Sequence, residues 1–84
     1  MPDNQLNKIQ IKMEDKVYLK KLGDKILHLR HAQEISQEKL AEKIGTYRNQ
    51  IARIEGGKTN SSINMLRKIA EELGTTISEL VKIN

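Results

Sequence analysis

Several polar side chains between residues 48 and 53 are of the types that recognise base edges in double-stranded DNA. Arg48 and Arg53 can each donate two parallel hydrogen bonds to a guanine, and the amide of Asn49 matches an adenine. At helical spacing these side chains fall on the face opposite Ile51 and Ile54. The pattern predicts a helix with one buried face and one face that fits a DNA major groove.

Two alternatives stay open on this helix. A cationic, amide-bearing face can also be an ordinary solvated surface, and only its structural context favours DNA. Tyr47, at the start of the helix, lies toward the apolar side of the helical wheel, so it either packs against the core or contacts DNA. Gln50 lies at the margin of the outer face.

The helix forms the second half of a predicted helix-turn-helix, about residues 36–56. Ser36 can accept a hydrogen bond from the free amides of a first helical turn, which predicts a short helix starting here. Gly45 is expected to end this helix in a left-handed backbone conformation, which glycine adopts without steric strain. Gly56 and Gly57 then end the second helix of the pair.

The remaining chain predicts three more helices and therefore an all-α domain over residues 15–84. A first helix begins near Asp15, a good N-cap, and carries one apolar stripe. Ser62 caps a fourth helix, whose core stripe starts at Ile63. Thr76 opens a short fifth helix with a capping box. Short loops between five helices are typical of a compact bundle.

Residues 1–14 precede this domain as a short N-terminal arm. Ile9, Ile11 and Met13 alternate with polar residues, a period-two pattern that could form a short strand. A lone strand is not stable in water unless it pairs with something. Three interpretations follow: a flexible arm, an extension of the first helix, or an arm that pairs with a second subunit.

The composition of the chain restricts the class of protein. With 84 residues and a formal net charge of +4, it is one small domain that suits a polyanionic partner. The absence of cysteine excludes disulfides and thiolate metal sites. Two Tyr are the only aromatic residues, which argues against a single-strand binder that stacks bases on rings. Neither a membrane span nor a signal-peptide core is evident, so a soluble cytoplasmic protein is expected.

Nothing in the sequence predicts an enzyme, a cofactor or a metal site. His28 and His31 have a spacing that metal ligands use, but no third ligand at a matching spacing accompanies them. Gly56 and Gly57 lack the Lys-Ser/Thr pair of a nucleotide-binding loop. Ser, His and Asp occur without the strand–turn–helix context of a catalytic nucleophile.

From residue 22 to residue 81 the chain resembles the lambda-repressor-like, or Cro/CI-type, helix-turn-helix domains, also called the xenobiotic-response-element family. Four segments in the family's order and spacing carry the resemblance: LGDKILHLR (22–30), SQEKLAEKIG (36–45), IARIEGGK (51–58) and LRKIAEELGTTISEL (66–80). It implies a compact five-helix bundle, with the third helix in the major groove and the second across the DNA backbone.

The resemblance also implies roles for individual residues. The family's base-reading positions are matched by Tyr47, Arg48, Asn49, Gln50 and Arg53. Its phosphate-contacting positions are matched by Gln37, Lys58, Thr59 and Asn60. An internal ion pair of relatives is matched by Arg30 and Glu55. Two positions depart from the family: Tyr47 replaces the usual Ser or Thr cap, which leaves Thr46 as a candidate cap, and Ser61 replaces a Pro.

The resemblance and the residues together predict a sequence-specific, double-stranded DNA-binding transcriptional regulator, associated with the nucleoid. Because one such module offers few base-reading side chains, a homodimer on a palindromic operator is expected. Its dimer surface is expected on the fifth helix, at Ile77, Leu80, Val81 and Ile83. A phage-type repressor, a restriction-modification controller and an antitoxin with a toxin partner all fit this pattern. The alternative is a protein-interaction module that keeps the fold without binding DNA.

Overall fold

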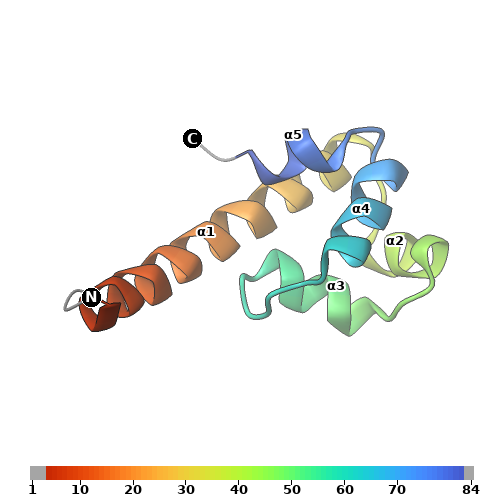
Figure 1. Ribbon diagram of the computed structural model, residues 1–84. Coiled ribbons are helices and arrows are strands. Elements are labelled where there is room, and N and C mark those ends of the chain that lie inside the picture. Colours follow the sequence, from red (N-terminus) through yellow and green to blue (C-terminus); the bar gives the residue numbers. More distant parts are fainter. Residues whose placement is uncertain (1–3, 83–84) are drawn as a thin grey trace.

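Five α-helices follow one another in a computed structural model that describes residues 4–82 and, for side chains, residues 15–82. They are α1 (Asn4–Ala32), α2 (Gln37–Ile44), α3 (Arg48–Glu55), α4 (Ile63–Glu72) and α5 (Ile77–Val81). Between residues 4 and 82 no strand occurs, so the expected all-α, five-helix fold is confirmed. The four shorter helices gather around the C-terminal half of α1 (Figure 1).

One apolar core holds the five helices together, and each helix contributes a fully buried side chain to it. These side chains are Ile26, Leu40, Ile51, Ile69 and Leu80. Apolar residues three or four positions away extend each buried stripe along its helix, as expected for helices that face a shared interior. The core therefore lies in the interior that all five helices share, and it fixes α3 from its inner side, where Ile51 and Ile54 are buried.

Predicted side-chain caps begin α2, α4 and α5, and a predicted glycine ends α2. The hydroxyl oxygen of Ser36 accepts a hydrogen bond from the Lys39 amide at 3.0 Å. Ser62 caps α4 and Thr76 caps α5 in the same way, each at 3.1 Å. Gly45 ends α2 with a φ of 78°, the left-handed conformation expected there.

α4 departs from the prediction at its first residue. Ile63 was expected to begin the core stripe, but 66 % of its surface is exposed, so this expectation is wrong. Side chains in a helix lean toward its N-terminus, so the first side chain of α4 extends past the end of the core. The buried stripe of α4 begins instead at Leu66.

α1 begins at Asn4 rather than near Asp15. Residues 4–14 are helical, so among the three interpretations of this segment the structure contains the helix extension and not the strand. No Gly or Pro interrupts the chain from Asn4 to Lys21, and most residues there favour a helix. The first half of α1 projects from the body, which gives the molecule a long axis of 48 Å (Figure 1). The described helices, α1 included, are not apolar enough to cross a membrane.

A close crossing of α1 and α3 positions the helix-turn-helix. A Cβ atom added at Gly23 would lie 2.4 Å from the carbonyl oxygens of both Ile54 and Glu55. Only a glycine permits this approach, because real Cβ atoms do not come so close to backbone atoms. A Cβ at Gly57 would likewise lie 2.8 Å from the Cα of Lys20. The end of α3 therefore rests directly on the backbone of α1.

Polar side chains of α1, and of Gln33 just after it, also hold the ends of the last two helices. The Tyr18 hydroxyl donates to the Val81 carbonyl at 2.8 Å. The Lys25 ammonium donates to the carbonyl of Lys82 at 3.0 Å and also to that of Glu79. The Gln33 amide donates to the Leu73 carbonyl at 2.7 Å. These bonds satisfy carbonyl groups that a helix end leaves without a partner.

Candidate nucleic-acid interface

The two faces of α3 differ in burial as the sequence predicts. Ile51 and Ile54 face the core, with 0 % and 3 % of their surfaces exposed. Arg48, Asn49 and Arg53 are exposed on the other side of the helix. The structure therefore brings the three main base-reading candidates together on one solvent-facing surface, which we call the outer face of α3. Ala52 is half-buried between them, and its small side chain does not project from this surface.

Tyr47 and Gln50 lie at the edges of the outer face. Tyr47 is 82 % exposed, so the interpretation that it packs against the core is wrong. The helical wheel does not apply to it, because Tyr47 precedes α3 with an extended backbone (φ −111°, ψ 150°). Its side chain makes no capping hydrogen bond, and no described bond from Thr46 replaces that cap. Gln50 is half-buried, in agreement with its expected marginal position.

The ion pair expected between Arg30 and Glu55 is present and joins α1 to the end of α3. Arg30 Nε lies 2.6 Å from Glu55 Oε2, and Arg30 Nη2 lies 2.9 Å from Glu55 Oε1. Both residues are buried, with 6 % and 3 % of their surfaces exposed. The hydrogen bond to Glu55 and then its charge raise the pKa of Arg30, against the opposing effect of burial. Arg30 also donates to the Ile35 carbonyl at 2.8 Å, which fixes the approach to α2.

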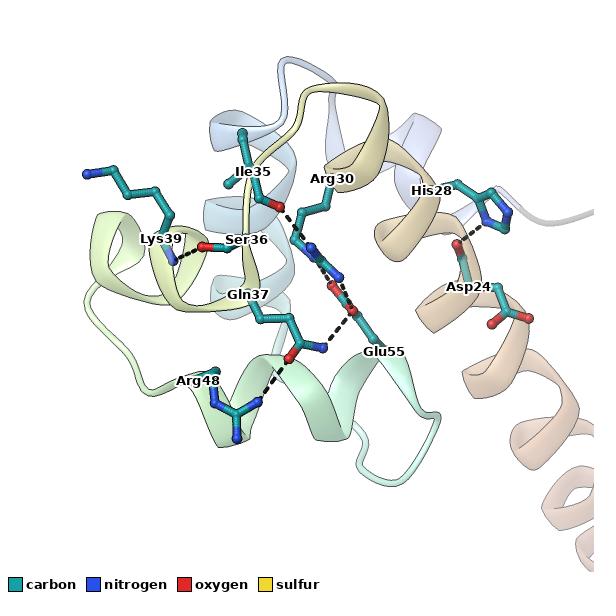
Figure 2. A network of polar contacts seen from close by, with 9 residues as sticks. All are labelled: Asp24, His28, Arg30, Ile35, Ser36, Gln37, Lys39, Arg48 and Glu55. Carbon is teal, nitrogen blue, oxygen red and sulfur yellow. Dashed lines mark hydrogen bonds and ion pairs between the residues drawn. The ribbon is translucent and has the colours of Figure 1, made fainter.

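Gln37 connects this ion pair to the outer face of α3. Its amide nitrogen, Nε2, donates to Glu55 Oε1 at 3.0 Å, and its Oε1 accepts a hydrogen bond from Arg48 Nη1 at 3.2 Å. Figure 2 shows the resulting chain of contacts from Arg30 through Glu55 and Gln37 to Arg48. The sequence did not predict this network, because its partners lie 18 and 11 positions away from Gln37 and leave no local pattern.

The loop after α3 presents the remaining phosphate-contacting candidates. The amide of Lys58 donates back to the Arg53 carbonyl at 2.9 Å, with Gly57 in the left-handed conformation, so α3 ends in a tight, hydrogen-bonded turn. Lys58 and Asn60 are exposed and Thr59 is half-buried. In Figure 1 this loop follows α3 directly and lies beside the middle of α1.

The charge of this region is more positive at its surface than its sequence suggests. Glu55 is the one acid between residues 47 and 62. Because it is buried and paired with Arg30, its negative charge is neutralised inside the protein. Arg48, Arg53 and Lys58 therefore face solvent without a neighbouring surface acid from this stretch, as a phosphate-binding surface requires.

The side chains described for residues 15–82 contain no group of three or more His, Cys, Asp or Glu that could hold a metal ion. His28, one of the two histidines, uses its Nδ1 in a 2.7 Å contact with the Asp24 carbonyl one turn earlier (Figure 2). That contact gives it a local structural role.

The residues predicted to form a dimer surface on α5 differ in how far they are exposed. Leu80 is fully buried in the core of the single chain, so it offers nothing to a second copy, and this expectation is wrong. Its position in a one-turn helix that packs on α1 and α4 turns it inward. Ile77 and Val81 are half-buried and keep part of their apolar surface exposed. Ile83 lies outside the described residues.

Comparisons with known proteins agree with this geometry. A helix-turn-helix family model matches residues 26–80. The control protein C.MunI of a Mycoplasma species is 41 % identical over 61 residues, which cover 71 % of this chain and 82 % of that protein. The restriction-modification controller protein C.AhdI from Aeromonas hydrophila has a TM-score of 0.71 at 35 % identity, covering 74 % of this chain and 94 % of that one.

A third comparison concerns the fold alone. The clp gene regulator ClgR from Corynebacterium glutamicum has a TM-score of 0.73 at 19 % identity, covering 76 % of this chain and 68 % of that one. The family match spans both helices of the helix-turn-helix and the loop that follows them. The chain therefore belongs to the helix-turn-helix family of the Cro/CI type, whose members are DNA-binding transcriptional regulators.

Proposed function

We propose that this protein is a restriction-modification controller that binds a palindromic operator as a homodimer. The outer face of α3 carries the proposal: Arg48, Asn49 and Arg53 are exposed together, and Glu55, the one acid between residues 47 and 62, is neutralised inside the protein. The likeness to a control protein at 41 % identity and to a restriction-modification controller protein at 35 % identity favours the controller over a phage-type repressor or an antitoxin with a toxin partner.

In this proposal the residues divide into two groups by what they contact. Base edges in the major groove are read from the outer face of α3 and its margins, by Tyr47, Arg48, Asn49, Gln50 and Arg53. Phosphates are contacted from the start of α2 and from the loop after α3, by Gln37, Lys58, Thr59 and Asn60. The first group supplies sequence preference and the second supplies affinity and register.

A dimer is part of the proposal because one module buries little DNA surface. Two copies related by a twofold axis would present their α3 helices to half-sites about 34 Å apart. The exposed parts of Ile77 and Val81 on α5 are the proposed contact, with the projecting residues 4–14 of α1 as a second candidate. The proposed location follows from operator binding: a protein bound to its operator would lie in the cytoplasm, on the nucleoid.

DNA binding is tested by titrating a labelled duplex and following its fluorescence anisotropy. The proposal predicts binding of mixed-sequence duplex at low salt and tighter binding of a cognate site at physiological salt. The alternative, a protein-interaction module with the same fold, predicts no binding of either duplex. A cationic, amide-bearing outer face favours DNA, since an interaction module would present an acidic or apolar one.

The dimer is tested by analytical ultracentrifugation. Val81→Glu adds a charge to the proposed contact and should shift the protein to monomers with its helical content retained. Ser78→Glu is a matched control, because it adds the same charge to an exposed position of the same helix. Dissociation by both variants, or by neither, would contradict the assignment of the contact to Val81.

A further inference from the structure

The first half of α1 carries a lysine at every turn along one side. Lys8, Lys12, Lys16 and Lys20 are four positions apart in a continuous helix, so they form one row that turns slowly round the axis. We propose that this row, which we call the lysine row, contacts phosphates of the operator beside those that the loop after α3 contacts. The inference rests on the proposed function and deepens it, because it adds a DNA contact from outside the family match, which begins at residue 26.

The lysine row meets the loop after α3 at Lys20. Because a Cβ atom at Gly57 would lie 2.8 Å from the Cα of Lys20, this loop rests directly on α1 there. The end of α3 rests on Gly23, three positions later. Positions 16, 20 and 23 are spaced four and three apart, so they share one side of the helix. Lys16, which is exposed, therefore lies on the side of α1 that carries α3, one turn before Lys20.

Beyond the loop, the first half of α1 continues away from the body. Figure 1 shows it leaving α5 behind, and Figure 2 shows the same helix continuing past the loop after α3. A helix advances about 1.5 Å per residue, so a lysine stands about every 6 Å along the row. A DNA strand carries a phosphate about every 3.4 Å along the axis, so such a row can contact several of them. The lysine row therefore extends the phosphate-contacting surface that the loop begins.

The charges nearest to Lys16 along its side of the helix are positive. The four positions one turn away from it hold two lysines, a methionine and a leucine, and no acid. Asp15 is the next residue in the chain but lies about 100° round the helix. Like charges four positions apart destabilise an isolated helix, so the lysines of the row repel one another in the free protein. Phosphates relieve this repulsion, which makes the row complementary to a polyanion.

Lys20 has an acidic partner that DNA can replace. Its ammonium lies 2.9 Å from the carboxylate of Asp24, and both side chains are exposed, by 59 % and 47 %. An exposed ion pair of this kind contributes little free energy, so a phosphate can compete for the ammonium. Lys20 can therefore act together with Lys16 when DNA is bound.

DNA fits the lysine row better than a second copy of the chain does. A twofold axis brings the same surface of both copies together. Two copies that paired along this side of α1 would set one lysine row against the other, and like charges would oppose the contact. Charge therefore favours DNA phosphates as the partner of the row.

The inference is tested by the salt dependence of binding to a cognate duplex obtained by selection from a random pool. Lys16→Gln removes one charge and keeps a residue that favours a helix. It should lower the slope of log Kd against log salt concentration by about one, so its disadvantage against the parent protein should shrink about threefold between about 50 and 200 mM salt. The double variant Lys12→Gln/Lys16→Gln should lower the slope by about two. Slopes equal to that of the parent protein would overturn the inference.

Lys21→Gln is the matched control, because it removes the same charge from an exposed position of the same helix. Position 21 lies about 200° round the helix from Gly23, on the side away from α3. This variant should keep the slope of the parent protein. Lys16→Arg retains the charge and should also keep the slope. An equal fall in slope for Lys16→Gln and Lys21→Gln would show an effect of net charge alone and would overturn the inference.

Hydroxyl-radical cleavage of the bound duplex locates the contact. The parent protein should protect a stretch of DNA backbone next to the stretch that Lys58→Ala exposes. Lys12→Gln/Lys16→Gln should expose the first stretch to cleavage and leave the second protected. Since phosphate contacts carry no base preference, selection from a random pool with this double variant should enrich the same sequence as the parent protein. An unchanged cleavage pattern, or a changed enriched sequence, would contradict the assignment of the row to phosphates.

Two further measurements separate failure of this inference from failure of the proposed function. In analytical ultracentrifugation without DNA, Lys12→Gln/Lys16→Gln should keep the oligomeric state of the parent protein, and circular dichroism should show its helical content retained. A change of oligomeric state would assign the row to a contact between copies and overturn the inference. Equal binding of cognate and mixed duplex by the parent protein overturns the proposed function, and with it this inference. Selective binding with an unchanged salt slope in Lys16→Gln and in the double variant overturns the inference alone.

Discussion

The two faces of the eight-residue helix α3 serve opposite purposes. The inner face, with Ile51, Ile54 and Glu55, is buried against the core and against the backbone of α1. The outer face, with Arg48, Asn49 and Arg53, is exposed and takes no part in the core. The comparison teaches that stability and DNA recognition can be changed separately on one short helix.

The largest effect is expected from breaking the buried ion pair on the inner face. Glu55→Ala leaves Arg30 charged and buried without its partner, which should cost about 3 kcal/mol of unfolding free energy. Thermal unfolding followed by circular dichroism measures the loss, and Glu71→Ala, an exposed acid on α4, is the control. If Glu55→Ala left stability unchanged while weakening DNA binding, the assignment of Glu55 to the inner face would be wrong.

The crossing of α1 and α3 gives the second test of the inner face. A methyl group at Gly23 collides with the carbonyls of Ile54 and Glu55, so Gly23→Ala should destabilise the protein by about 1–3 kcal/mol. Urea unfolding measures the change. In an open helix position the same substitution stabilises by about 1 kcal/mol, so a gain in stability would show that the two helices do not cross this closely.

The outer face should respond in the opposite way. Arg48→Ala should cost about 1–3 kcal/mol of binding free energy on the cognate duplex and relax preference at one base pair. Its unfolding free energy should change by no more than about 0.5 kcal/mol, because Arg48 is exposed. Fluorescence anisotropy and thermal unfolding of the same sample measure both quantities. An equal loss on cognate and random DNA would remove Arg48 from the base-reading residues.

The smallest effect is expected from Lys58→Ala, which separates phosphate contacts from base-reading residues. Lys58, in the loop after α3, is proposed to contact phosphate and not a base. Lys58→Ala should therefore weaken cognate and mixed-sequence binding by the same factor and lower the salt slope of binding by about one. Titrations at several salt concentrations measure the slope. A loss confined to the cognate duplex would make Lys58 a base-reading residue.

Features with a local signal could be predicted from the sequence. Ser36, Ser62 and Thr76 bond to amides three residues later, so the residue type and its place before an apolar run suffice. Gly45 marks a backbone conformation that few other residues accept. The two faces of α3 follow from the period of the helix. The family resemblance added the Arg30–Glu55 pair, whose partners lie 25 positions apart.

Features that depend on three-dimensional context could not be predicted. The direction of the Leu80 side chain depends on how a one-turn helix packs. The helical period alone does not show that this side chain is buried in the core instead of lying on a dimer surface. The helical wheel does not describe Tyr47, because this residue precedes the first turn of α3. The start of α1 has no unique local signal, because the alternating residues Ile9, Ile11 and Met13 fit a helix as well as a strand. The contacts of Gln37 arise from the meeting of α2 and α3.

The most direct test of the central claim is selection of bound duplexes from a random-sequence pool, with the parent protein and with Arg48→Ala. If the outer face of α3 reads DNA, the parent protein should enrich an inverted repeat with half-sites about 34 Å apart, and Arg48→Ala should lose preference at one symmetric pair of positions. No enrichment by the parent protein, or an identical enriched sequence for both proteins, would contradict the account.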